Sequence, residues 1–527
     1  MDKLRIRNLR CISDTGDIEI KPLTVLVGKN SSGKSTFLRS FPLLKQTIET
    51  KRNEPILWYS SNYVDFGSFE ESINKKTKDT IAFEFEFCVK NDAVIDETYT
   101  RYMYNRPKYI TNSNLLNKFR VSVESKKMHF EVIKLHYEDN IIEICFKNKD
   151  KISELRINNR EFDAKLMSVD YRNYYGFLPK ILYKNSELHK SVSDLFFDYL
   201  YDTIKGLSHS ATKEDTIRTF VHNIVCSNSV GIFDSVKRQT TSAQRLRENI
   251  KNLNITDDVF QKIRDFAIGM HLNGLINLCN RYLEFYYSSV KYIAPLRASA
   301  QRYYRVQGLN VDEVDPLGQN IPMILQNMSE KEKDSFNKWV SLNFNFVIDT
   351  ITEGGHTSLK IRYKGDNEAI NFTDTGFGYS QILPIILLLW QSQSRYYNPR
   401  SRLNNLDRMF KRITGNNGIS TIVIEQPELH LHPSLQARLV DAFAQIILLS
   451  INENYKLNII IETHSETIIN RIGYIIAKNL YNFSNEYVNV LIFNQNSSNL
   501  SNIEATGYSN KGYLSKWPIG FFSPEDL

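Results

Sequence analysis

The sequence of 527 residues has little cysteine and no long apolar run. Its five cysteines are odd in number, lie far apart and form no Cys-x-x-Cys pair. This argues against a disulfide framework and against a cysteine-based zinc site. The first residues, Met-Asp-Lys-Leu-Arg-Ile-Arg, lack the apolar core of a secretory signal. The longest apolar run, residues 382–390, is too short to cross a bilayer. These absences predict a cytoplasmic protein that does not enter a membrane.

The sequence also lacks a strong excess of charge of one sign. Hydrophobic residues make up 42% and charged residues 24%, which is typical of ordinary globular proteins. A net charge of +7 over this length permits contact with nucleic acid without requiring it. The length allows two to four domains, or one domain with a large insertion.

Residues 28–36, Gly-Lys-Asn-Ser-Ser-Gly-Lys-Ser-Thr, form a complete phosphate-binding loop in the right context. The apolar run at 23–27 predicts a buried strand before the loop, and residues 36–46 predict a helix after it. The two glycines let backbone N–H groups approach a triphosphate, Lys34 reaches the terminal phosphates, and the Ser35 hydroxyl ligates Mg²⁺. The predicted nucleotide-binding residues are Gly28, Lys29, Asn30, Ser31, Ser32, Gly33, Lys34, Ser35 and Thr36.

Hydrophobic periodicity divides the rest of the chain. Alternation of apolar and polar residues predicts strands within 1–27 and over 80–89, 119–123, 130–137 and 141–146, the last four as an antiparallel sheet. From 186 to 287 the period becomes helical. The predicted parts are an N-terminal ATPase lobe (1–90), a β-rich part of the head (91–185), a helical insertion (186–290) and a C-terminal ATPase lobe (291–527).

A second candidate segment for nucleotide chemistry is 421–433, Thr-Ile-Val-Ile-Glu-Gln-Pro-Glu-Leu-His-Leu-His-Pro. An apolar strand that ends in a carboxylate is the Walker B arrangement. Glu425 is therefore predicted to hold Mg²⁺ from the side opposite to Ser35. By itself, Glu425 could equally cap a turn.

Two further segments follow the same logic. Residues 459–465, Ile-Ile-Ile-Glu-Thr-His-Ser, predict a buried strand that ends near His464. Residues 374–381, Asp-Thr-Gly-Phe-Gly-Tyr-Ser-Gln, form a glycine-rich turn before a helix, which is a second anion-binding helix start. Alone, the histidine could sit in a core and the glycines could form a bend. Together, in this order behind a phosphate loop, they predict one divided nucleotide site.

The order of these motifs resembles ABC-type ATPase heads, the group that includes SMC, Rad50 and the OLD-like ATPases. Glu-Gln-Pro-Glu-Leu-His-Leu-His-Pro with Glu-Thr-His-Ser resembles the OLD-like (AAA15/21-type) branch. Residues 64–69, 294–304 and 516–522 match a bacterial subgroup of that branch. The resemblance covers both ends of the chain but not 90–290. It implies an α/β fold: an ABC-type P-loop ATPase head with a mixed β lobe, a parallel-sheet lobe and a helical insertion, which binds ATP and Mg²⁺.

The resemblance also implies a head-to-head dimer, or a higher homo-oligomer, with ATP between the phosphate loop of one subunit and the signature turn of the other. His464 would be the switch histidine that senses the γ-phosphate. The residues carried over to the signature turn are Gly376, Gly378 and Ser380, which would contact the γ-phosphate, and the adjacent Gln381.

One position departs from the family pattern. Most ABC heads have a glutamate after the Walker B carboxylate, where it positions the attacking water, and this chain has Gln426. An amide orients water but cannot take its proton. Either Glu428 substitutes, or hydrolysis is slow and the ATP-bound dimer persists. We favour slow turnover assisted by Glu428. The predicted catalytic residues are Glu425, Gln426, Glu428 and His464, and the predicted metal ligands are Ser35 and Glu425.

Only a short tail follows His464, so we expect no Toprim domain of the kind that OLD nucleases carry after the ATPase, and the sequence shows no His-Asn-His nuclease pattern. It resembles the PtuA ATPases of Septu and retron antiviral systems, which pair with the HNH nuclease PtuB. This implies a sensor or scaffold that regulates a partner nuclease or toxin, with a retron reverse transcriptase and its RNA/DNA as a further partner. The alternatives are a DNA-repair ATPase of RecF or Rad50 type that acts directly on DNA, and a head that uses ATP only to hold a dimer.

Direct contact with nucleic acid has weaker support. Residues 101–109, Arg-Tyr-Met-Tyr-Asn-Arg-Pro-Lys-Tyr, alternate cations with aromatic rings that stack on bases. A solvated charged face is the simpler interpretation for the cations of the helical insertion. Those cations are Lys237, Arg238, Arg245, Arg247 and Lys251.

Overall fold

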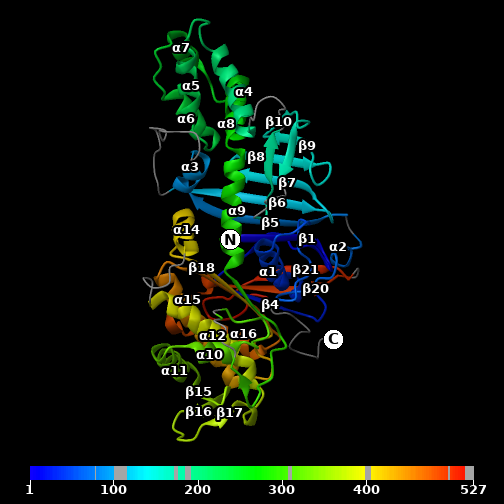
Figure 1. The fold of residues 1–527 in the computed structure, drawn as a ribbon, viewed down its shortest axis with the longest axis vertical. Helices are drawn as coiled ribbons and strands as arrows, with labels where there is room; N and C mark the ends of the chain where they lie inside the picture. Colours follow the sequence, from blue (N-terminus) through cyan, green and yellow to red (C-terminus); the bar gives the residue numbers. More distant parts are fainter. Residues whose placement is uncertain are drawn as a thin grey trace.

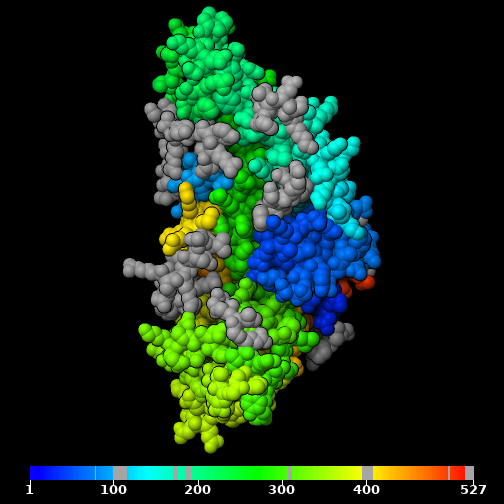
Figure 2. Space-filling view, in the orientation of Figure 1, coloured from blue at the N-terminus to red at the C-terminus, as the bar shows by residue number. Residues whose placement is uncertain are grey.

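The computed structural model describes residues 1–76, 79–99, 115–170, 176–183, 191–306, 311, 313–397, 405–496 and 499–516. Figure 1 shows their elements arranged along one long axis. A parallel sheet lies near the middle, an antiparallel sheet and a helical arm extend to one end, and a small antiparallel sheet lies at the other. In the space-filling view the green helical arm and the yellow-green segment around β15–β17 form these two ends (Figure 2).

The central sheet contains the strand that leads into the phosphate loop. Its order is β13 (Val290–Ile293), β18 (Ile419–Glu425), β19 (Lys456–Glu462), β4 (Leu23–Gly28), β20 (Val488–Gln495) and β21 (Ser501–Thr506). All neighbouring pairs are parallel except β20 with β21. The predicted buried strands at 23–27, 421–424 and 458–461 are therefore confirmed. Because parallel strands end at one edge, the ends of β4, β18 and β19 meet there.

Alternating side chains of these strands enter two separate cores. Ile422, Ile424 and Ile459 belong to one apolar cluster, whereas Val423 and Ile460 belong to the other. This is the period-2 alternation expected when a sheet is covered on both faces. Helix α1 (Lys34–Glu49) covers one face, and α12 (Gly378–Tyr397), α15 (Pro433–Asn452) and α16 (Glu466–Ala477) contribute to the cluster on the other.

Helix α15 is long and apolar enough, by length and composition, to cross a membrane. Its apolar residues include Phe443, Ile446 and Ile447, which are buried in the cluster on the parallel sheet. A buried core helix passes the same test, so its composition follows from packing against β19.

The second sheet is antiparallel and has nine strands. Its order is β10 (Arg160–Phe162), β9 (Ile152–Ile157), β8 (Asn140–Phe146), β7 (Phe130–Tyr137), β6 (Leu116–Ser125), β5 (Ile81–Lys90), β1 (Lys3–Leu9) and β2 (Ile12–Asp14), with β3 (Ile18–Glu19) paired to β1. The predicted antiparallel strands between 80 and 146 are confirmed. The sheet runs across residue 90, so the predicted parts 1–90 and 91–185 share it, while β4 belongs to the parallel sheet.

The helical period between 186 and 287 is also confirmed. The helices are α4 (Val192–Gly206), α5 (Glu214–His222), α6 (Ser229–Lys237), α7 (Gln244–Asn252), α8 (Asp258–Met270) and α9 (Leu272–Ser288). Helix α9 packs against α1, α3 and β18, and thereby connects the arm to the nucleotide-binding lobe.

The other elements complete the two lobes. They are α2 (Phe69–Ser72), α3 (Asn91–Tyr99), β11 (Met167–Asp170), β12 (Lys180–Tyr183), β14 (Tyr304–Arg305), α10 (Ile321–Asn327), α11 (Glu330–Phe344), β15 (Phe346–Glu353), β16 (His356–Tyr363), β17 (Ile370–Asn371) and α14 (Asn405–Thr414). Strands β14, β15 and β17 all pair with β16 in a small antiparallel sheet that precedes α12.

The buried His271 between α8 and α9 predicts a pH dependence of stability. Burial lowers its pKa from 6.5 to about 4. Between these values the unfolded chain binds more protons than the folded one, so the free energy of unfolding rises with pH. We expect the shifted pKa of His271 alone to lower the free energy of unfolding by about 3 kcal/mol as the pH falls from 7 to 4.

Urea unfolding midpoints of the wild type and His271→Gln across this range measure the effect. The substitution should flatten the curve, whereas His209→Gln, at an exposed histidine, should leave it unchanged. An equally steep acid loss in His271→Gln would refute the assignment.

Candidate nucleotide-binding site

The phosphate loop has a backbone that only glycine fits at two positions. Gly28 has φ 142° and Gly33 has φ 102°, both in the range that side chains disfavour. A Cβ at Gly28 would lie 2.0 Å from the carbonyl oxygen of Phe493 on β20. A Cβ at Gly33 would lie 2.5 Å from the hydroxyl of Ser501 on β21. The loop therefore depends on close contact with the strands beyond β4.

Those strands also hold the loop through hydrogen bonds. The Gln495 side chain donates to the carbonyl of Ser31 at 2.7 Å, and the Ser501 hydroxyl donates to the carbonyl of Ser32 at 2.7 Å. The carbonyl of Ser32 and the N–H of Gly33 belong to one peptide group and point in opposite directions. Because the carbonyl faces Ser501 on β21, the N–H of Gly33 points away from β21.

A cavity of about 310 Å³ lies against this loop. It is lined by Cys11, Asn30, Ser31, Gly33, Lys34, Ser35, Thr36, Gln426, Glu462 and His464. Burial lowers the pKa of Lys34, whose ammonium donates to the carbonyls of Gly28 and Lys29, both at 2.8 Å. One cavity thus unites the phosphate loop with Gln426 and His464 from two distant segments.

Glu462 is the carboxylate that contacts Ser35. The Ser35 hydroxyl lies 2.8 Å from Oε2 and 3.1 Å from Oε1 of Glu462, and the Lys34 ammonium lies 4.0 Å from Oε1. Glu462 is the last residue of β19, the strand next to β4. Glu462 was not among the predicted site residues, although the segment Glu-Thr-His-Ser contained a signal for it: a carboxylate at the end of a buried strand.

Glu425 lies beside Glu462 but has different partners. Arg39 donates to its two carboxylate oxygens at 2.7 and 2.8 Å, and the Tyr292 hydroxyl donates at 2.6 Å. The hydrogen bond to Glu425 raises the pKa of Arg39, and burial raises the pKa of Tyr292. The structure thus departs from the expectation that Glu425 faces Ser35. Arg39 is four residues after Ser35, so one face of α1 places Ser35 over β19 and Arg39 over β18.

Gln426 and Glu428 form the exit from β18. Gln426 has a left-handed backbone with φ 43°, and its N–H donates to the carbonyl of Glu462 at 2.8 Å. Glu428 accepts hydrogen bonds from the Thr463 hydroxyl at 2.9 Å and from the His464 N–H at 2.7 Å. Burial raises the pKa of Glu428. The Glu428 carboxylate therefore holds the turn that carries His464.

His464 itself faces the phosphate loop. Burial, together with the charge of Lys34, lowers the pKa of His464, so the imidazole is neutral at pH 7. A neutral imidazole can donate one hydrogen bond to a phosphate oxygen or accept one from water.

The predicted signature turn is built on the exit from β18. A Cβ at Gly378, where α12 begins, would lie 2.4 Å from the carbonyl oxygen of His430. The Gln381 amide is buried, and its oxygen and nitrogen contact the backbone N–H and C=O of Arg297 at 3.3 Å. Arg297 in turn donates to the carbonyl of Glu425 at 2.7 Å. Gly376 and Phe377 at the tip are exposed.

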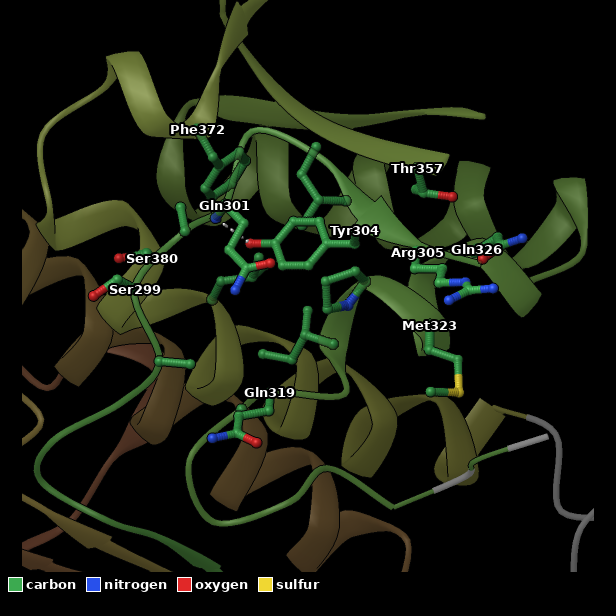
Figure 3. A pocket seen from close by; sticks show the side chains of 17 residues that line it. Ser299, Gln301, Tyr304, Arg305, Gln319, Met323, Gln326, Thr357, Phe372 and Ser380 are labelled. Carbon is green, nitrogen blue, oxygen red and sulfur yellow. Dashed lines mark hydrogen bonds between the residues drawn. The ribbon is translucent and has the colours of Figure 1, made fainter. Parts of the chain in front are cut away.

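Ser380 lines a second cavity, of about 660 Å³. Figure 3 shows Ser380 next to Ser299 on one side and Tyr304 at the centre, where its hydroxyl accepts a hydrogen bond from the Gln301 N–H at 2.8 Å. The other labelled residues are Arg305, Gln319, Met323, Gln326, Thr357 and Phe372. Ser380 of the signature turn and Lys34 of the phosphate loop therefore line different cavities of one chain.

The two basic segments named for nucleic-acid contact differ in what the structure describes. Residues 101–109 lie outside the part of the chain that the structure describes, as do 517–522 of the matched tail. Lys237 donates to the carbonyl of Lys251, and Arg238 pairs with Asp234. Arg247 donates to the backbone carbonyl of Thr241, in the turn that precedes α7. These three cations therefore have partners on α6, on α7 and in the turn between the two helices.

Comparison with known proteins places the chain in a family of ATPase domains. The family model for the AAA ATPase domain, AAA_15, matches residues 1–469. The Smc head domain of Pyrococcus furiosus bound to the C-terminal domain of ScpA is 9% identical over 96% of each chain, with a TM-score of 0.32. The SMC head domain of Thermotoga maritima is 9% identical over 95% of this chain and 97% of its own, with a TM-score of 0.33. No curated protein matches the sequence.

The expected fold is confirmed: an α/β, ABC-type P-loop head. The assignment follows from the strand order around β4, from the loop between β4 and α1, and from the apolar cluster that α1 shares with the antiparallel sheet.

The Arg39–Glu425 pair predicts a specific loss of stability. Arg39→Ala would leave a buried carboxylate without its two guanidinium hydrogen bonds. We expect a cost of about 2–3 kcal/mol, because Arg39 is one-third exposed and water partly compensates. The exposed Arg245→Ala is the control, with a change within about 0.5 kcal/mol.

Urea unfolding of the double variant Arg39→Met/Glu425→Gln separates charge from packing. It should recover most of the loss, since no uncompensated charge is then buried. Equal losses in the single and double variants would show that the charge pair is not the cause.

Proposed function

Because this chain belongs to the AAA ATPase domain family, we propose that it binds Mg²⁺–ATP between two copies of itself and hydrolyses it slowly. The observation that carries the proposal is the single cavity shared by Lys34, Ser35, Gln426, Glu462 and His464. These residues come from three segments and supply a cation, a metal-ligating hydroxyl, a carboxylate, an amide and a neutral imidazole.

The site residues fit this ligand pair. Lys34 lies against carbonyls of its own loop and can turn to the terminal phosphates. Ser35 and the adjacent carboxylates are oxygen donors of the kind that Mg²⁺ prefers. When bound, the metal would withdraw charge from the phosphate oxygens. His464 would hydrogen-bond the γ-phosphate, and Gln426 would orient water without accepting its proton.

The separation of the two cavities supports a dimer. The tip of the signature turn is exposed and opens the 20-residue helix α12, whose N-terminus favours an anion. Within one chain it does not share the cavity of Lys34. We infer that Gly376, Gly378 and Ser380 meet the phosphates held by a second copy, and that Gln381 fixes the turn.

We further propose that the head acts as a sensor and scaffold in a bacterial antiviral system of Septu or retron type, where it restrains a partner nuclease or toxin. The support is the motif resemblance and an arm, α4–α8, that extends away from the nucleotide site (Figure 1). The arm exposes Tyr199 and Val230, which offer apolar contact to a partner. A slow ATPase suits this role, because the closed state then lasts long enough to hold the partner.

Turnover of Gln426→Glu tests the slow-hydrolysis proposal. A carboxylate at this position can take the proton of the attacking water, so we expect kcat to rise at least about 10-fold. Glu428→Gln should lower kcat, because it weakens the bonds to Thr463 and His464. The exposed Gln244→Glu is the matched control and should not change the rate.

Phosphate release under saturating ATP measures these rates. Light scattering measures the molar mass with and without ATP, and we expect the mass of a dimer when ATP is bound. An unchanged rate in Glu428→Gln would eliminate that residue from catalysis. In the same assay, linear duplex DNA should leave the rate of the isolated chain unchanged. Stimulation by DNA ends would favour the DNA-repair alternative.

A further inference from the structure

Two carboxylates end neighbouring strands at the nucleotide cavity. Glu425 and Glu462 are paired in register at the ends of β18 and β19. Both side chains are buried, with 3% and 4% exposed. From the sequence pattern either could oppose Ser35, and the Walker B pattern selects Glu425. The contacts that each makes decide between them.

The charge of the Glu425 carboxylate is already balanced by the guanidinium of Arg39. Both of its oxygens accept from Arg39, and Oε1 also accepts from the Tyr292 hydroxyl. A two-point guanidinium–carboxylate pair is one of the stronger charge-assisted hydrogen bonds in proteins. A metal ion that recruited Glu425 would have to break this pair and leave Arg39 facing a second cation. Glu425 is also not among the described residues that line the cavity.

The Glu462 carboxylate, in contrast, faces the cavity and pairs with no guanidinium among the described residues. Among the described side chains, its hydrogen-bond donor is the hydroxyl of Ser35. One hydroxyl has one proton, whereas a carboxylate has about four acceptor positions. The Lys34 ammonium is 4.0 Å away and is bonded to the loop carbonyls of Gly28 and Lys29.

We propose that Glu462, and not Glu425, is the carboxylate that meets the Mg²⁺ ligated by Ser35. This rests on the proposed binding of Mg²⁺–ATP. Strand β19 lies between β18 and β4, so its last residue is the nearer one to the loop. Glu425 is then a positioning residue, which fixes α1 over β18 through Arg39.

The test compares ATP affinity with Mg²⁺ and with EDTA by isothermal titration calorimetry. Wild type should bind ATP more tightly with Mg²⁺. Glu462→Gln should lose at least about 10-fold of that gain. Glu425→Gln, at the residue paired in register with Glu462, should lose less of it, because Glu425 acts on the site only through Arg39. Affinity in EDTA and the Tm of each variant show whether the site is folded.

Mn²⁺ EPR with a non-hydrolysable ATP analogue gives a second readout, in which Glu462→Gln should bind Mn²⁺ more weakly than Glu425→Gln. Glu462→Asp, which keeps the charge on a shorter side chain, should give an intermediate loss. Retention of the full Mg²⁺ gain in Glu462→Gln overturns the proposal. Absence of ATP binding in the wild type would instead overturn the proposed function, so the two failures are distinct.

Discussion

A two-point pair between Arg39 and Glu425 joins the first helix of the nucleotide lobe to the end of β18, and the rest of the site depends on it. The same helix carries Ser35 one turn earlier, so fixing Arg39 also fixes Ser35 over Glu462. Arg297 extends this connection, because it donates to the carbonyl of Glu425 and its backbone is held by Gln381 of the signature helix. The phosphate loop and the signature turn are thereby linked inside one chain.

A second constraint comes from the strands that follow the catalytic segments. The phosphate loop is pressed against β20 and β21 so closely that Gly28 and Gly33 have no room for side chains. Gln495 and Ser501 hold its carbonyls. Residues more than 450 positions later in the chain therefore shape the loop, because the parallel sheet places β20 beside β4.

Much of this could be predicted because the signals are local. The loop of residues 28–36 needs only its own glycines, lysine and serine between a strand and a helix. Period-2 alternation predicted β5, β7 and β8, and the helical period predicted α4 to α9. Glu462 was missed because its sequence signal is weak by itself: many buried strands end in a polar residue. Its meaning depends on β19 lying next to β4, which is a property of the strand order.

Local patterns were enough to predict the phosphate loop, the two kinds of sheet and the position of Gln426 where a glutamate is usual. These features follow from residue type and spacing along a single segment. The folded chain was needed to show which carboxylate contacts Ser35, which groups Glu428 accepts hydrogen bonds from, and that Ser380 lines a different cavity from Lys34. Each of these is a relation between segments far apart in the chain, and strand register and helix packing set it. Spacing along one chain does not encode such distances, because they exist only once the strands have paired.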